Sequence, residues 1–195
     1  MATPRDMSIA PAVDEARAVA TITLAFSDDP VARWALKDPH RYLTYWPAFV
    51  RAFGGAAFAH GTADAVGDGA GVALWLPPGV EPDEEAMGAI IVEAVPEAER
   101  EEVLGFMAQV DEFHPKEPHW YLPLIGVDVT MRGRGYGSAL LRHAAERCDR
   151  DSLPAYLEAT SPLNKALYAR HGFEEVGVAQ HGSSPPMWPM LRQPS

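Results

Sequence analysis

The chain of 195 residues has only one cysteine, Cys148, so no disulfide can form within it. It also lacks any apolar run near the roughly 20 residues that a membrane-spanning helix needs. Residues 1–6 lack the apolar core of a secretory signal peptide. These absences predict no membrane partner, and we expect a soluble enzyme or binding domain in the cytoplasm.

Positive charge is also scarce. The chain carries 16 Lys and Arg against 27 Asp and Glu, which gives a net charge of -11. Such a chain repels the phosphates of a nucleic acid, so we expect no nucleic-acid partner. Hydrophobic residues at 47% and charged residues at 22% are typical of a soluble globular protein. Length and composition together predict one domain over residues 1–195 with a sizeable core.

Apolar periodicity and turn residues predict an alternation of strands and helices. The expected strands cover residues 6–10, 62–66, 71–76, 120–129, 155–160, 173–179 and 187–191. The expected helices cover residues 14–26, 41–58, two stretches of 81–117 separated at Pro96, a stretch from Gly137 onward, and 161–171. Asp28-Asp29-Pro30 is expected to end the first helix, because the residue before proline disfavours helical backbone angles.

The stretch that carries the most chemical information runs from residue 119 to residue 147. A predicted strand leads into the loop Arg132-Gly133-Arg134-Gly135-Tyr136-Gly137, and small or apolar residues on one helical face follow. Glycines let backbone N–H groups approach an anion, and a helix N-terminus adds the positive end of its dipole. This stretch therefore predicts a phosphate-binding site.

Two common phosphate-binding motifs do not fit this loop. A Rossmann site needs G-x-G-x-x-G at the first strand, but the spacing from Gly133 fails at the third glycine. A P-loop needs a lysine directly after its glycines, and none follows here. The remaining pattern is an arginine followed by G-x-G directly after a strand.

That pattern, Arg132-x-x-Gly135-x-Gly137, resembles the signature of the GNAT superfamily of acyl-CoA-dependent N-acetyltransferases. Its flanks match too: residues 126–128 before it, residues 138–141 after it, and Asn164 with Tyr168 to Phe173 downstream. The chain is similar to one branch in particular, the puromycin N-acetyltransferase-like enzymes. That similarity rests on residues 25–30, 114–120, 157–160 and 188–192.

The resemblance implies an α/β (α+β) fold. In this fold a mixed, twisted sheet of six to seven strands has helices on both faces, and strands four and five splay apart. Residues 120–129 would form strand four and residues 155–160 strand five. The pantetheine arm of acetyl-CoA, the implied co-substrate, would lie in the gap between them. No metal site is expected.

Transferred residue by residue, the resemblance also implies a cofactor-binding set. Backbone groups at the end of strand four would pair with the pantetheine amides, and the loop N–H groups would bind the pyrophosphate. Arg132 would position the loop, and Asn164 would contact the arm. The full set is Val127, Asp128, Val129, Arg132, Gly133, Arg134, Gly135, Tyr136, Gly137, Ser138 and Asn164.

Acetyl transfer to an amine needs a base, donors for the oxyanion, and a proton for the leaving thiolate. The resemblance places Tyr168 as the acid and a backbone N–H near Val127 as the oxyanion donor. Glu158 is the candidate base, because a carboxylate within a buried strand is unfavourable unless it is paired or used. A structural carboxylate at Glu158, a core aromatic at Tyr168, and a water relay without a dedicated base all stay open. The lesser candidates for the base are Asp28, Asp29 and His181.

The expected acceptor is a small primary amine, of amino-nucleoside or aminoglycoside type, and the chain is expected to be a monomer or homodimer. The expected substrate-binding residues are Phe26, Asp29, Trp34 and Tyr45. Residues 81–117 hold 12 acids against Arg100 and Lys116, and this acidity either forms a solvated face or attracts a cationic amine. Two alternatives remain: a catalytically idle acyl-CoA-binding module and an enzyme that acetylates proteins.

Overall fold

The computed structural model describes residues 7–12 and 14–195 of the chain. Its helices are α1 (Glu15–Ala25), α2 (Pro30–Ala35), α3 (Pro39–Gly54), α4 (Ala56–Ala59), α5 (Glu84–Ala94), α6 (Glu97–Asp111), α7 (Tyr136–Asp151) and α8 (Pro162–Ala169), with a 3-10 turn η1 (Val129–Met131). Its strands are β1 (Ile9–Pro11), β2 (Ala63–Val66), β3 (Gly71–Leu76), β4 (Trp120–Val127), β5 (Ala155–Ala159), β6 (Glu174–Glu175) and β7 (Trp188–Arg192). Of these helices, none is long and apolar enough to cross a membrane.

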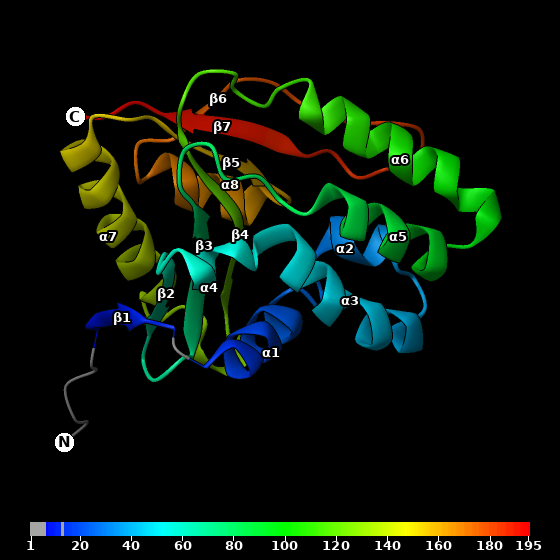
Figure 1. The fold of residues 1–195 in the computed structure, drawn as a ribbon, viewed down its shortest axis with the longest axis horizontal. Coiled ribbons are helices and arrows are strands. Elements are labelled where there is room, and N and C mark those ends of the chain that lie inside the picture. Colours follow the sequence, from blue (N-terminus) through cyan, green and yellow to red (C-terminus); the bar gives the residue numbers. More distant parts are fainter. Residues whose placement is uncertain (1–6, 13) are drawn as a thin grey trace.

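The strands form one seven-stranded sheet in the order β1-β2-β3-β4-β5-β7-β6 (Figure 1). Among the described strands, β4 and β5 are the one parallel pair, and every other neighbouring pair is antiparallel. The predicted mixed sheet of six to seven strands is confirmed.

Each face of the sheet is covered by its own set of helices. On β3, Val72, Leu74 and Leu76 pack with α1, α3, α5 and α6, whereas Ala73 and Trp75 pack with α7 and α8. This alternation follows from the two-residue period of a strand, and it produces two cores with the sheet between them. Figure 1 shows α7 on one side of the sheet and α1 and α3 on the other. Cys148 lies buried in the α7 core, as expected for a small apolar residue.

Several boundaries differ from the sequence-based expectation. Helix α2 was not predicted, because Asp28-Asp29-Pro30 was interpreted only as the end of a helix. The Asp29 carboxylate accepts hydrogen bonds from the Val31 and Ala32 N–H groups, and Pro30 occupies the first helical turn. Helix α1 itself ends at Ala25, and the residues that were expected to end it begin α2 instead. The predicted helix over residues 41–58 is two helices, α3 and α4, which meet at Gly55.

Three predicted strands were also wrong in extent. The strand expected over residues 173–179 is limited to the two residues of β6. The next residue on β7 is Pro189, whose carbonyl accepts from the Val176 N–H. Proline has no N–H to donate in return, so the ladder stops there. The strand expected to reach residue 129 ends at Val127, because the Asp128 carboxylate accepts the Thr130 N–H and turns the chain into η1. The strand expected at residues 6–10 is β1, and residue 6 lies outside the described residues.

Strands β4 and β5 part soon after they meet. Trp120–Leu122 pair with Ala155–Leu157, and the pairing stops there although β4 continues to Val127. On the other edge of β4, Leu74 pairs with Leu124 and Leu76 with Tyr121, so the single residue Trp75 on β3 lies opposite two residues of β4. This is a β-bulge, and it contains Pro123, which cannot donate to a ladder. The expected splay of strands four and five is confirmed.

Helix α1 packs directly on the backbone of β4 at Gly126. A Cβ atom at this position would lie 2.7 Å from the Ala25 Cβ and 3.1 Å from the Ile22 Cδ1. The end of α1 leads into Phe26 and Asp29, two of the predicted site residues, so this close approach positions that part of the site.

We expect Gly126→Ala to lower the free energy of unfolding by about 1–3 kcal/mol, because the added methyl group pushes α1 away from β4. Urea denaturation measures this change. Gly88→Ala is the matched control, since its Cβ would meet nothing within 4 Å and alanine favours a helix interior, so it should be neutral or slightly stabilising. Equal stability of both variants would contradict the close packing.

Candidate active site

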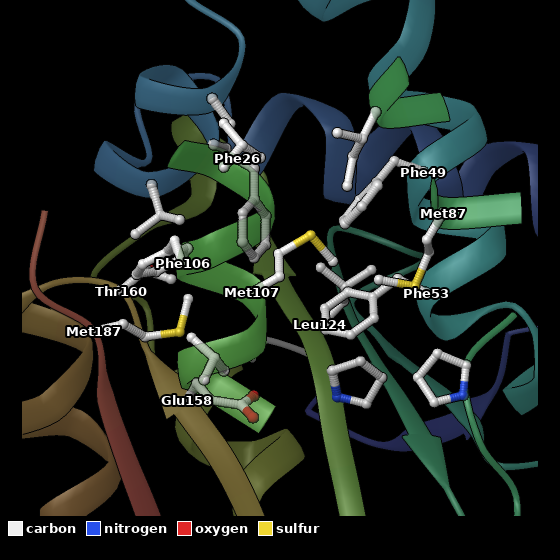
Figure 2. Close-up of a pocket in the computed structure, with 18 of the residues that line it drawn as sticks. Phe26, Phe49, Phe53, Met87, Phe106, Met107, Leu124, Glu158, Thr160 and Met187 are labelled. Carbon is white, nitrogen blue, oxygen red and sulfur yellow. The ribbon is translucent and has the colours of Figure 1, made fainter. Parts of the chain in front are cut away.

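A cavity of about 450 Å³ opens where β4 and β5 part, within the range of sites that enclose small organic ligands. Its walls come from the end of α1, from α2, α3, α5, α6 and α8, and from the bulged part of β4 (Figure 2). The predicted site residues Phe26, Asp29, Trp34, Glu158, Asn164 and Tyr168 all line it. Tyr45 is not among the lining residues and instead packs against the core on this side of the sheet.

Glu158 lies on β5 one residue past the last pair with β4, partly buried in the cavity wall. Its carboxylate accepts a hydrogen bond of 3.0 Å from the Tyr121 hydroxyl. Burial raises the pKa of Glu158 to about 7, although the hydrogen bond from Tyr121 opposes the rise. Glu158 therefore changes its charge near neutral pH, which suits a group that takes up and releases protons.

A cluster of aromatic and imidazole rings supports this end of the cavity. The Tyr121 and Tyr156 ring centroids are 5.8 Å apart, and the His114 ring meets them edge-on at 4.7 and 5.0 Å. The Nε2 atoms of His114 and His119 are 3.0 Å apart, and the His119 Nδ1 lies 2.7 Å from the Glu117 carbonyl oxygen. A carbonyl accepts only, so Nδ1 of His119 carries a proton and its Nε2 accepts from His114 when both rings are neutral.

Tyr168 and Asn164 reach the cavity from α8, which packs against β5. The Tyr168 side chain is buried, and its ring centroid lies 6.2 Å from that of Phe173. Burial raises the pKa of Tyr168, and the nearby carboxylates of Asp29 and Glu158 raise it further. The hydroxyl therefore keeps its proton at neutral pH. The Ser161 side chain caps α8 through the Asn164 N–H, and this cap fixes the helix that carries both residues.

The Asp29 carboxylate lines the cavity but is committed to the fold. One oxygen accepts the Val31 and Ala32 N–H groups, and the other accepts the Thr160 hydroxyl at the end of β5. Burial raises the pKa of Asp29 despite these hydrogen bonds. Its carboxylate thus joins α2 to β5. His181, a lesser candidate for the base, lies outside the cavity lining, with its ring against Gly105 of α6.

The loop before α7 has the backbone geometry expected of an anion site. Gly133 and Gly135 adopt positive φ angles of 72° and 89°, which side chains disfavour. Helices α1, α2, α3, α5 and α8 each begin with an Asp or Ser side chain that accepts a helical N–H. The N-cap residue of α7 is Gly135, which has no side chain to accept from the first helical N–H groups. In the described structure no other side chain caps them, so these donors remain available to an anion.

Two further residues of the predicted phosphate site have structural roles. Arg132 makes a bidentate ion pair with Asp28 at 2.8 and 2.9 Å and donates to the Ala25 carbonyl at 2.6 Å. This hydrogen-bonded pair lowers the pKa of Asp28. Arg132 therefore anchors the loop to the end of α1. Arg134, like Arg132, is exposed to solvent. The Tyr136 ring is buried in the α7 core, so only its backbone can face an anion.

The free edge of β4 offers donors to a ligand in the gap. The Asp128 N–H donates to the Ala70 carbonyl on the β3 side at 2.8 Å. Successive N–H groups of a strand point to opposite edges, so the Val127 N–H points to the edge that β5 leaves open. An extended amide chain can pair with that edge as an added strand. The Asp128 N–H is not available for this, because Ala70 occupies it.

Sequence reasoning missed Tyr121, Tyr156 and the apolar wall from α5 and α6. Tyr156 and Glu158 are two residues apart on one strand, so the strand period already places them on the same face. Tyr121 is the parallel partner of Tyr156, but that register becomes visible only in the sheet. The wall from α5 and α6 had no comparable signal, because its apolar residues lie within the acidic stretch of residues 81–117.

Comparison with known proteins identifies the family. The model of the acetyltransferase (GNAT) family matches residues 42–173, which is more than half of the chain. The chain belongs to the GNAT family. It is 26% identical over 201 residues to an uncharacterised N-acetyltransferase of Schizosaccharomyces pombe, a match that covers 94% of this chain and 81% of that protein.

Solved structures agree with this assignment. A protein from Corynebacterium glutamicum described as histone acetyltransferase HPA2 and related acetyltransferase is similar with a TM-score of 0.70 and 26% identity, covering 98% of both chains. An agmatine N-acetyltransferase has a TM-score of 0.61 at 14% identity, covering 95% of this chain and 98% of that one. At this identity the second likeness shows the shared GNAT fold alone.

Gly135→Asp in this GNAT chain is expected to abolish binding of acetyl-CoA, because the carboxylate repels phosphate and fills the space before the α7 N–H groups. Isothermal calorimetry measures the affinity. Gly61→Asp is the matched control, since Gly61 has a positive φ of 65° and open space around it. Wild-type affinity in Gly135→Asp would refute the phosphate role of the loop.

Glu158 should also make stability depend on pH. With a folded pKa of about 7 against an ordinary value of 4.5, the folded chain holds a proton that the unfolded chain has lost between these pH values. Stability therefore falls as pH rises through this window. From pH 5 to pH 8 we expect the wild type to lose roughly 2–3 kcal/mol relative to Glu158→Gln in urea unfolding. Parallel pH curves for the two proteins would contradict the raised pKa.

Proposed function

We propose that this GNAT chain transfers an acetyl group from acetyl-CoA to a primary amine of a small molecule, by direct attack within a ternary complex. The observation that carries the proposal is that Glu158, on β5, and Tyr168, on α8, line one cavity at the point where β4 and β5 part. The amine would enter from the α2, α3 and α5 side. The agmatine N-acetyltransferase of the same fold supports a small amine as the acceptor.

The residues present fit acetyl-CoA, which would supply the activated thioester. The uncapped N–H groups of α7 suit its pyrophosphate, and the Val127 N–H on the open edge of β4 suits its amide chain. We propose that Val129 and Asn164 complete this contact and that Gly133, Arg134, Gly137 and Ser138 complete the phosphate site.

In the reaction, the Glu158 carboxylate takes the proton that the attacking nitrogen must lose, directly or through one water. The Val127 N–H donates to the oxygen of the reacting acyl group as negative charge develops there. The Tyr168 hydroxyl donates its proton to the departing thiolate. A pKa near 7 at Glu158 and a raised pKa at Tyr168 give each residue the required protonation state at neutral pH.

A second candidate function is an idle acyl-CoA-binding module. It is favoured by the absence of a carboxylate between Trp120 and Val127, because β4 then supplies no base of its own. A thiol-release assay with a panel of primary amines separates the two. Release of CoA that depends on the amine supports the enzyme, and acetyl-CoA binding without turnover supports the idle module. Mass spectrometry of protein incubated with acetyl-CoA and the enzyme tests for acetylation of proteins.

Several narrower predictions stay open. Membership of the puromycin N-acetyltransferase-like branch rests on the motifs in residues 25–30, 114–120, 157–160 and 188–192, and a panel that includes amino-nucleosides and aminoglycosides tests it. A single domain over residues 1–195, a cytoplasmic location and a monomeric or homodimeric state are likewise proposals from the sequence.

Tyr168→Phe is expected to lower kcat about 100-fold or more while leaving acetyl-CoA affinity nearly unchanged, because only the proton donor is lost. Tyr42→Phe is the matched control: it also removes a buried tyrosine hydroxyl, which donates to the Thr23 carbonyl, but Tyr42 lies outside the cavity lining. A parallel loss of affinity and turnover in Tyr168→Phe would assign the residue to binding instead.

A further inference from the structure

The cavity wall is strongly apolar between its two ends. Figure 2 shows Phe26, Phe49, Phe53 and Met107 turned toward one shared space, with Glu158 and Thr160 at the β5 end. The described residues that line the cavity include no lysine and no arginine. A carboxylate or phosphate on an acceptor would therefore be buried without a cationic partner, which is strongly unfavourable.

The acidic side chains that line the cavity differ in burial and in what they already bind. Glu81, Glu84 and Asp111 line its outer part and are exposed to solvent. Asp29 is already occupied by the N-terminus of α2 and by Thr160. Glu158 is then the one partly buried lining carboxylate left for an amine at the β5 end, whereas Asp111, which is near enough to raise the pKa of Glu158, is exposed to solvent. The exposed acids attract a cationic amine to the opening, but a second cation held against the apolar part of the wall would lose its hydration without a carboxylate beside it.

A continuous line of ring contacts leads inward to Glu158. Centroid distances are 5.6 Å from Phe26 to Trp46, 5.1 Å from Trp46 to Phe49, 5.5 Å from Phe49 to Phe53 and 6.0 Å from Phe53 to Tyr121. The Tyr121 hydroxyl donates to the Glu158 carboxylate. An aromatic or branched-alkyl group lying along these rings points an attached amine toward Glu158.

From these features we infer that the acceptor is a primary monoamine with an uncharged, apolar body, and that amino acids and polycationic amines are poor acceptors. This inference rests on the proposed acetyl transfer and narrows its substrate class. It excludes aminoglycosides, which carry several charged amines on a polar body. It also conflicts with transferring the substrate of the agmatine N-acetyltransferase to this chain, since agmatine carries a second cation.

The test compares three amines as acceptors with acetyl-CoA in a thiol-release assay. Phenylethylamine has an aromatic body, phenylalanine adds a carboxylate to the same body, and agmatine has a flexible, dicationic one. We expect kcat/KM for phenylethylamine to exceed that for phenylalanine at least 100-fold and that for agmatine at least tenfold.

A variant that adds a cation to the cavity sharpens the test. Met107→Lys should lower kcat/KM for phenylethylamine. It should also reduce the ratio of kcat/KM for phenylethylamine to kcat/KM for phenylalanine at least tenfold, because the lysine ammonium group pairs with the carboxylate of phenylalanine. Leu43→Lys is the matched control, since Leu43 is 61% exposed and lies outside the cavity lining, and it should leave the ratio unchanged.

The outcomes separate this inference from the function on which it rests. Turnover of phenylalanine or agmatine within threefold of phenylethylamine would overturn the inference and leave acetyl transfer standing. No turnover with any of the three amines, despite acetyl-CoA binding, would overturn both. An unchanged ratio in a folded Met107→Lys variant would also count against the inference.

Discussion

The parting of β4 and β5 is the constraint on which the rest of the site depends. The bulge at Leu122–Leu124 and the missing N–H of Pro123 end the pairing after three residues, although both strands continue. A continuous ladder at this point would close the sheet and leave no place for a ligand. The opening frees one edge of β4, exposes Glu158 at the end of β5, and allows α8 to bring Tyr168 to the same cavity.

Charge is distributed so that each part of the opening suits a different partner. The uncapped N-terminus of α7 offers N–H donors, whereas Asp or Ser side chains occupy the equivalent donors of α1, α2, α3, α5 and α8. Exposed acids of residues 81–117, among them Glu84 of α5, line the cavity. Asp111 lies close enough to Glu158 to affect its pKa, which burial raises to near neutral pH. The acidic segment thus carries both a solvated face and an apolar wall of the cavity.

The sequence predicted the parts of the molecule that local patterns specify. The glycine loop, the neighbouring strands β2 and β3 and the two helices separated at Pro96 follow from turn chemistry and periodicity, and the structure has them. Local patterns did not predict the Tyr121–Glu158 hydrogen bond, because it depends on the β4–β5 register. They also missed α2, since Asp29 was interpreted as the end of the first helix but caps α2. Tyr45 was expected in the site as one of the aromatic residues of the early helices, but it packs against the core and does not line the cavity.

The most direct test is a crystal structure with CoA and a primary monoamine bound. It should show the pyrophosphate at the N-terminus of α7, the pantetheine arm along the open edge of β4, and the sulfur in the cavity beside Tyr168. The amine nitrogen should then lie within reach of the Glu158 carboxylate, directly or through one water. CoA bound away from the gap between β4 and β5, or a sulfur outside the cavity, would contradict the account.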